Sequence, residues 1–193
     1  MKTPLNYQSS EFDCAPVTFL NALQYLFERE QINPELIKII YQHSMDRPDG
    51  FGVPGKCGTS AQAVQLLTAK INQYSLANNL RLCCEFLPSG DIRSDNPYLS
   101  HCISGGGVLL ACVHFDKAYH YVLATEMDDF FVGIFDPYYT PRSAAVIEHY
   151  FADDNPFKLN RRVEREIFFG QNRQTYSLGE PDTRECVLMY RSL

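Results

Sequence analysis

The sequence predicts an α+β protein in which N-terminal helices pack on an antiparallel β-sheet. In the first half of the chain, apolar residues recur with the spacing of amphipathic helices. After the triplet Gly105-Gly106-Gly107 they occur instead in short runs that are separated by turn residues. These runs follow one another without a helix between them, which is typical of an antiparallel meander and not of alternating strands and helices.

The first helix is predicted over residues 17–30. Pro16 suits its first turn, because proline has no N–H to leave unpaired and its φ is already helical. The apolar positions follow an i, i+3, i+4, i+7 pattern: Val17, Leu20, Ala22, Leu23, Leu26 and Phe27.

Four more elements are predicted before the glycine triplet. They are helices over 35–43, 61–72 and 97–103 and a strand over 80–86, with a further short helix near 76–79. Asn33-Pro34 starts the first of these helices, and Thr59 or Ser60 caps the second. Residues 45–58 are rich in glycine and proline and are predicted to form a surface loop.

The sheet is predicted mainly from the second half of the chain. Strands are expected over 108–115, 119–125, 130–135, 166–169 and 185–191, and a helix over 143–151. The run 108–115 is continuously apolar, as expected for a central strand that is covered on both faces. Asp136-Pro137 ends the third strand, since proline cannot continue a central ladder.

Composition limits the class of protein. A length of 193 residues fits a single domain over 1–193, with 45% hydrophobic and 21% charged residues, as in ordinary soluble globular proteins. The net charge of −6 argues against nucleic acid as the main partner. No apolar run reaches the length of a membrane span, and the N-terminus lacks the apolar core of a signal peptide. We therefore expect a protein that is cytoplasmic or already processed, without a membrane partner.

The cysteines are predicted to be free thiols. Seven are present: Cys14, Cys57, Cys83, Cys84, Cys102, Cys112 and Cys186. An odd number without a secretory signal argues against a disulfide framework. No CxxC pair occurs, and the adjacent Cys83 and Cys84 would point to opposite faces of a strand, so neither zinc nor another cofactor is expected. Most of the cysteines other than Cys14 are expected in the core.

Cys14 is the candidate nucleophile. It lies at the start of the first helix, where unpaired N–H groups and the positive end of the helix dipole favour a thiolate. The alternative is an ordinary buried cysteine, because free cysteine is among the most buried residue types. A catalytic role requires a base and a group that orients the base.

His120 and Asp136 are the candidates for those two groups. A three-residue turn over 127–129 would pair them directly across a hairpin, with their Cβ atoms about 4.5–5.5 Å apart. A two-residue turn would break this pairing, and an aspartate before proline is often only a turn former. His114 and His101 are competing bases, and Asp116 lies close to His114 in the sequence.

These motifs resemble those of the papain-like cysteine peptidases. They are Gln8 six positions before the cysteine, Asp13-Cys14 opening a helix, His120-Tyr121-Val122 on a strand, and Asp136-Pro137 sixteen positions later. The narrower resemblance is to the bacteriocin-processing family (double-glycine leader peptidases) and its stand-alone bacterial relatives. It covers residues 8–137 and leaves 138–193 outside. Ala15 departs from it, since the family usually has glycine after the cysteine. The transporter parts fused to true leader peptidases are also lacking, so the resemblance does not specify the substrate.

The resemblance implies a role for each residue. Cys14 attacks an amide or acyl carbonyl, His120 protonates the leaving amine and then activates water, and Asp136 orients His120. Gln8 and the backbone N–H of Cys14 would donate to the oxyanion. The expected substrate is a peptide or protein, with no cofactor; the oligomeric state is not indicated.

Three alternatives stay open. An acyltransferase or amidase would use the same triad. A non-catalytic binding domain of the same fold would present a basic cluster to an acidic partner, although such a cluster, interleaved with Glu164 and Glu166, is more often a solvated face. Its residues are Lys158, Arg161, Arg162 and Arg165. A structural or metal-binding protein built on the cysteines has little support from their spacing.

Overall fold

The protein is an α+β structure, seen in a computed structural model that describes residues 1–140 and 149–192. Within these residues, seven strands form one antiparallel sheet in the order β1-β7-β2-β3-β4-β6-β5. The strands are β1 (Leu82–Phe86), β2 (Val108–Phe115), β3 (Ala118–Met127), β4 (Phe131–Phe135), β5 (His149–Asn155), β6 (Leu159–Glu164) and β7 (Cys186–Arg191). The α-helices are α1 (Cys14–Leu26), α2 (Pro34–Gln42), α3 (Ala61–Ala77), α4 (Pro97–Ser104) and α5 (Arg165–Phe168).

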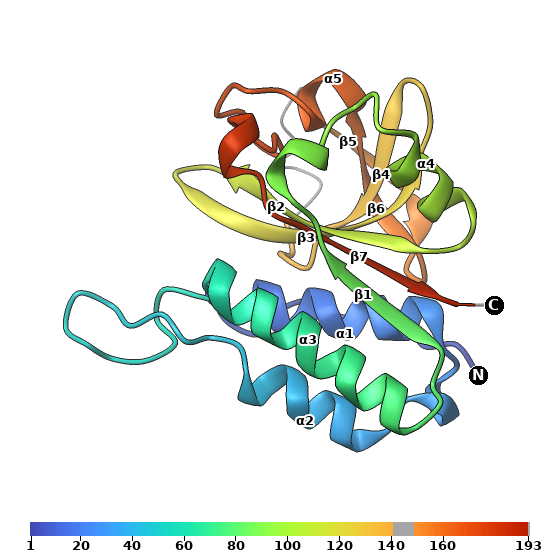
Figure 1. The fold of residues 1–193 in the computed structure, drawn as a ribbon. Helices are drawn as coiled ribbons and strands as arrows, with labels where there is room; N and C mark the ends of the chain where they lie inside the picture. Colours follow the sequence, from blue (N-terminus) through green and yellow to red (C-terminus); the bar gives the residue numbers. More distant parts are fainter. Residues whose placement is uncertain (141–148, 193) are drawn as a thin grey trace.

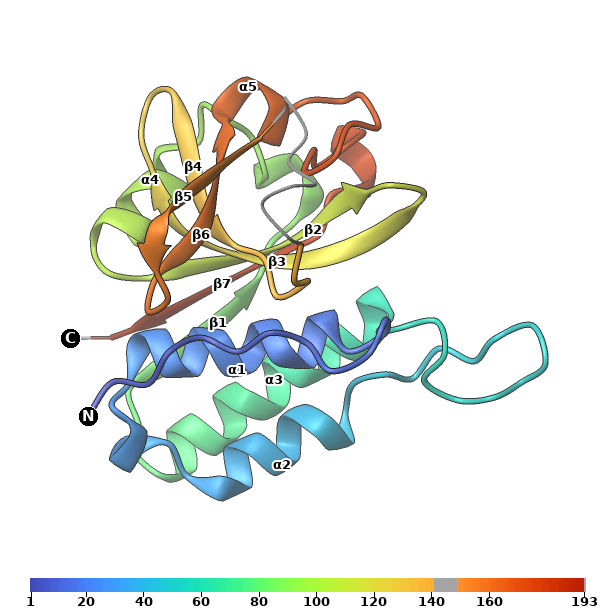
Figure 2. The same ribbon diagram turned by 180° about the vertical axis from the view of Figure 1, so that it is seen from behind.

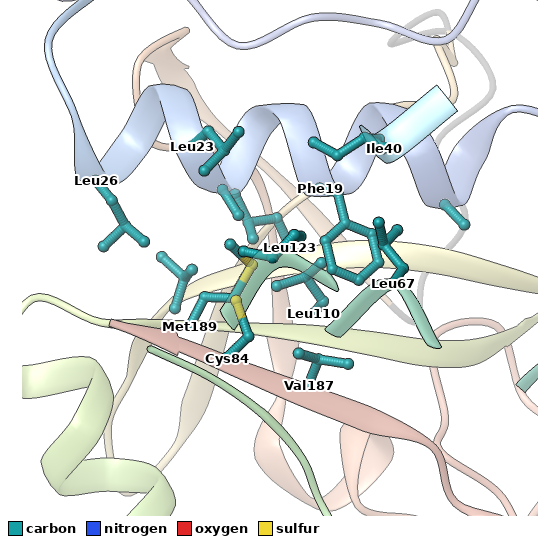
Figure 3. Packing of buried hydrophobic residues seen from close by; sticks show 14 of the residues in the cluster. Phe19, Leu23, Leu26, Ile40, Leu67, Cys84, Leu110, Leu123, Val187 and Met189 are labelled. Atoms are coloured by element: carbon teal, nitrogen blue, oxygen red, sulfur yellow. The ribbon is translucent and has the colours of Figure 1, made fainter. Parts of the chain in front are cut away.

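The three N-terminal helices lie together on one side of the sheet, and α4 and α5 lie on the other (Figures 1 and 2). The most extensive packing between helices and sheet is that of α1 on β3 and of α3 on β1. Figure 3 shows the core between them, where Phe19 of α1 points toward Leu123 of β3 and Leu110 of β2.

Strand β2 contributes to a hydrophobic core on each face of the sheet. Leu110 belongs to the core under the helices, whereas its neighbour Leu109 belongs to the core on the opposite face, and neither is accessible to solvent. Burying one leucine side chain stabilises the fold by about 1.5–3 kcal/mol. The prediction that the apolar run 108–115 is a strand covered on both faces is therefore confirmed.

The predicted helices of the first half are confirmed, with shifted ends. Helix α1 begins at Cys14 and ends at Leu26, and Pro16 lies in its first turn. Asn33 caps α2 by accepting the N–H of Glu35, and Ser60 caps α3 by accepting that of Ala63. Helix α3 continues to Ala77, so of the short helix predicted near 76–79 only residues 76 and 77 are helical, as the end of α3, and 78–79 form a turn.

The C-terminal third differs from the prediction. Residues 165–168 form the helix α5, where a strand over 166–169 was predicted, and four residues are too few to show a helical period. The connection 159–164 is the strand β6; its buried face carries Arg161 between Leu159 and Val163, and this charge hides the alternation. Of the helix predicted over 143–151, residues 149–151 belong to β5 and 143–148 lie outside the described residues.

Residues 45–58 form an irregular loop, as predicted, which projects from the helical layer before α3 (Figures 1 and 2). Asp49 organises its tip by accepting the N–H groups of Phe51 and Val53. The side chain of Phe51 is 95% exposed. Among the helices in the described ranges, none has both the length and the apolar character needed to cross a membrane.

Candidate active site

Cys14 is the first residue of α1 and lies against β3. Its exposed fraction is 8%, and Asp13 before it is equally buried. One turn along α1, the hydroxyl of Thr18 donates to the carbonyl oxygen of Tyr121 at 3.1 Å, in the interior of the protein. Because Tyr121 follows His120, this bond fixes the start of α1 beside the strand that carries the imidazole.

His120 connects Cys14 to Asp136. Its Nε2 lies 2.7 Å from Oδ1 of Asp136, and its ring also interacts with the side chain of Cys14, which raises the pKa of the imidazole. Because Nε2 is engaged by the carboxylate, Nδ1 is the ring nitrogen left for the thiol. His120 is 5% exposed and Asp136 is fully buried. The structure thus brings together all three residues of the predicted triad.

The charges of this cluster are coupled. Burial lowers the pKa of His120, but the charge and hydrogen bond of Asp136, together with the contact to Cys14, raise it to about 10. Burial raises the pKa of Asp136, but His120 and the donors around it lower that pKa below its ordinary value. Because the pKa of His120 is raised and that of Asp136 is lowered, the imidazole is cationic and the carboxylate anionic at neutral pH.

Two residues that the sequence did not point to hold Asp136 in place. The hydroxyl of Tyr176 donates to Oδ2 of Asp136 at 2.6 Å, and the side chain of Asn160 bonds both the N–H and the C=O of Asp136 at 2.8 Å. The backbone N–H of Tyr138 donates to Oδ1. Tyr176 is forty positions away in the sequence, and Asn160 lies on β6, a strand that was not predicted.

Aromatic rings enclose the His120–Asp136 pair. Phe115 lies 5.0 Å from the imidazole, between ring centroids, and 5.9 Å from the ring of Tyr176. Tyr176 itself has a φ of +69°, which is unusual for a bulky residue, and its N–H donates to the carbonyl oxygen of His114 at 2.7 Å. Such strain at a side chain that supports a charged pair is typical of functional sites.

The hairpin that brings His120 to Asp136 has a different register from the predicted one. Met127 pairs with Val132, so four residues separate these two paired positions, the last of them Phe131, the first residue of β4. The ladder also shifts between Ala124 and Glu126. Leu123 pairs with Phe135, and one further step would place Asp136 opposite residue 122. His120 is therefore a diagonal neighbour on the same face, within reach of a long side chain, and not the direct partner. Asp128 causes the longer turn by accepting the N–H groups of residues 130 and 131.

Gln8 lies in the extended segment that precedes α1. Its backbone N–H donates to the carbonyl oxygen of Pro137 at 2.8 Å, which ties this segment to the residue after Asp136. One N–H of its side-chain amide donates to the carbonyl oxygen of Ser10 at 2.7 Å, and an amide nitrogen carries a second donor. The carboxylate of Asp13 holds the turn between them by accepting the N–H groups of Ser9 and Ser10.

The competing bases lie elsewhere. His101 is exposed on α4, on the face of the sheet opposite to α1. His114 lies one residue before the end of β2 and packs on Tyr119, and its pKa is lowered by burial and, to a smaller extent, by the charge of Arg173. The histidine that interacts with Cys14 is His120.

The basic cluster does not form one exposed patch. Glu126 lies 2.6 Å from Lys158 and, across β4, 3.5 Å from Arg162, measured between charged atoms. Arg161 is buried, and Arg165 donates to the carbonyl oxygens of residues 94 and 128. Three of the four cations are thus engaged with other parts of the same chain, and the fourth is buried.

The seven cysteines are all free thiols, as predicted. Besides Cys14, two are buried and three are half-buried, whereas Cys57 is exposed. In residues 1–140 and 149–192, no group of three or more His, Cys, Asp or Glu side chains is arranged to hold a metal ion. A pocket of about 430 Å³ opens beside Cys14, between the loop before α3 and the sheet.

The chain was compared with protein-family models and with curated proteins, and nothing matched in either comparison. The resemblance to papain-like peptidases therefore stays a prediction. Its support comes from the residues themselves and from their geometry.

Proposed function

We propose that this protein is a papain-like cysteine peptidase that hydrolyses a peptide or amide bond with Cys14, His120 and Asp136. One observation carries the proposal: the imidazole that interacts with a thiol at the start of a helix has its Nε2 atom 2.7 Å from a buried carboxylate. This is the nucleophile–base–orienter geometry of covalent catalysis.

The reaction begins with an ion pair of Cys14 thiolate and His120 imidazolium. The thiolate sulfur attacks the carbonyl carbon, and the backbone N–H of Cys14 with the free amide N–H of Gln8 donates to the resulting oxyanion. The imidazolium gives its proton to the leaving amine, and a thioester with Cys14 remains. His120 then takes a proton from water, which attacks the thioester and releases the acid and the thiol.

Asp136 keeps the imidazole in one orientation and stabilises its cationic form. Its own position is fixed by the hydroxyl of Tyr176 and by Asn160. The arrangement of helices on one face of an antiparallel sheet, with the thiol on a helix and the imidazole on a strand, supports the papain-like fold.

The test is cleavage of a mixed peptide library, with the products identified by mass spectrometry. The protein is expected to cut peptides, whereas a Cys14→Ala variant is expected to be inactive. Cys186→Ala is the matched control, because it removes another buried thiol on β7 and is expected to remain active. Loss of a single oxyanion donor by Gln8→Ala should reduce the rate about 100-fold or more.

Added amine separates hydrolysis from acyl transfer on the same triad. If the products carry the added amine and hydrolysis is absent, the protein is a transferase and the peptidase assignment is wrong. Equal cleavage by the Cys14→Ala variant would contradict the whole mechanism.

A further inference from the structure

The pocket beside Cys14 contains a carboxylate that the proposed mechanism does not use. Its walls include Cys14 itself, Cys112 of β2 and Tyr121 of β3, and it holds Glu185 just before β7. The backbone carbonyl of Glu185 accepts the N–H of Cys112 at 3.0 Å, so the main chain at this position is fixed to the sheet. The pocket volume of about 430 Å³ accommodates one large side chain.

The Glu185 carboxylate is half-buried and has one direct partner among the described residues. The hydroxyl of Tyr121 donates to Oε1, and Tyr121 is itself buried. No cation of the described chain lies within ion-pair distance of this carboxylate. Removing a charged carboxylate from water without pairing it to a cation costs free energy. Burial accordingly raises the pKa of Glu185 to about 7, although the charge of Arg47 acts in the opposite direction.

The other charges around the pocket do not favour an anion. Arg47 is an exposed residue of the loop before α3 that also lines the pocket; it acts on Glu185 from beyond ion-pair distance and lowers the pKa of this carboxyl only in part. The positive end of α3 already has a carboxylate, because Asp46 accepts both the N–H and the hydroxyl of Ser60. Arg184 next to Glu185 is directed elsewhere, with its guanidinium donating to the carbonyl oxygens of residues 92, 169 and 179.

We propose that this pocket receives a lysine or arginine side chain of the substrate and that Glu185 is its partner. The inference rests on the proposed peptidase function, since it places the basic residue close to the carbonyl that Cys14 attacks. The aliphatic stem of such a side chain would lie on the ring of Tyr121, and its cationic end would meet the carboxylate. Glu185 is thus a specificity-determining residue and takes no part in the bond-breaking steps.

The test uses thiol-directed dipeptide electrophiles that differ only in one side chain: arginine, norleucine or glutamate, placed at either position. The rate of labelling at Cys14 is expected to be about tenfold or more higher for arginine than for norleucine, and lowest for glutamate. In Glu185→Gln the advantage of arginine should disappear, while the amide oxygen can still accept from Tyr121. Glu180→Gln, an exposed acid outside the pocket, is the matched control and should behave as the unmodified protein.

The pH gives a second readout. The arginine-to-norleucine ratio cancels the common reactivity of the thiol, and it should rise between pH 6 and pH 8 as Glu185 ionises. The neighbouring Cys112 and Cys186 stay neutral in this range because burial raises their pKa values, and Arg47 and Arg184 stay cationic. In Glu185→Gln the ratio should not change with pH.

Iodoacetamide separates the two proposals, because it is small and neutral and does not need the pocket. If it labels Cys14 rapidly but the three electrophiles react equally, the pocket assignment is wrong and the peptidase proposal stands. If iodoacetamide does not label Cys14 rapidly, the peptidase proposal fails. Binding of N-acetyl-arginine amide, monitored by NMR, then tests the pocket assignment alone. The assignment is supported if the protein binds this amide more tightly than the corresponding norleucine amide and if Glu185→Gln abolishes the difference. Equal binding of the two amides overturns the assignment.

Discussion

At the scale of single residues, Tyr176 is the addition that the structure makes to the predicted triad. It is fully buried, holds an unusual backbone conformation and donates to the carboxylate oxygen that His120 does not use. Its partner His114 lies far away in the sequence. No local pattern in the sequence could have identified it, because its role exists only once β2, β4 and the segment before β7 have come together.

Tyr176→Phe should lower kcat about tenfold and leave KM unchanged, because the hydroxyl positions Asp136 and does not touch the substrate. Losing this bond to a buried charged group should also cost about 1.5–3 kcal/mol of unfolding free energy. Steady-state kinetics and urea denaturation measure the two effects. Tyr98→Phe removes an exposed hydroxyl from Glu85 and should alter neither kinetic constant. An unchanged kcat in Tyr176→Phe would show that Asp136 does not need this support.

The raised pKa of His120 predicts how stability depends on pH. The dependence is easiest to interpret in the Cys14→Ala variant, because this variant has no thiol at position 14 that could exchange a proton with the imidazole. There Asp136 still holds the folded-state pKa above the unfolded value near 6.5, so the stabilisation is complete below pH 6.5 and is lost as the pH rises through the folded-state value.

Relative to Cys14→Ala/His120→Gln, the unfolding free energy of Cys14→Ala should therefore fall between pH 6.5 and pH 10, by at most about 1.4 kcal/mol per pH unit. Urea denaturation at a series of pH values measures the difference between the two variants. A difference that is independent of pH would mean that His120 does not gain its charge from Asp136.

At the scale of elements, the sequence located the hairpin but not its register. The strands 108–115, 119–125 and 130–135 were predicted nearly correctly, because apolar runs and turn residues mark them locally. The register depends on how Asp128 closes the turn and on the shift near Thr125. The hydroxyl of Thr125 donates to the carbonyl of Lys158, in the turn just before β6, a strand that was not predicted. His120 and Asp136 still share a face, because the actual register differs from the predicted one by an even number of residues at that end.

Two asparagines that make the same kind of bond allow a matched test of this element. Asn160 bonds the N–H and C=O of Asp136, and Asn72 bonds the N–H and C=O of Cys84 on β1. Asn160→Ala and Asn72→Ala should each reduce the unfolding free energy by about 1–3 kcal/mol. Under conditions in which both variants are folded, only Asn160→Ala should lose peptidase activity. Equal activity of the two would show that the Asp136 backbone needs no support from β6.

At the scale of the whole molecule, the sheet separates two hydrophobic cores that depend on the same strands. The fold class and the central strand followed from composition and periodicity, whereas β6, α5 and Glu185 did not, since their roles depend on contacts between distant segments. The neighbours Leu109 and Leu110 test whether the two cores form one cooperative unit, as a single domain over 1–193 requires.

Leu109→Ala and Leu110→Ala should each destabilise the protein by about 2–5 kcal/mol, because each leaves a cavity in a fully buried site. Both should shift one and the same unfolding transition, followed by far-ultraviolet and near-ultraviolet circular dichroism. Two separate transitions, with each variant shifting only one, would mean that the layers unfold independently.

The central claim is that His120 activates Cys14, and the alkylation rate of this thiol by iodoacetamide at pH 6 tests it most directly. Cys57, which is exposed, serves as the internal standard in the same chain. Peptide mapping by mass spectrometry should show Cys14 reacting faster than Cys57 although it is only 8% exposed, and slower than Cys57 in His120→Ala. Faster reaction of Cys57 in the unmodified protein, or no effect of His120→Ala, would contradict the account.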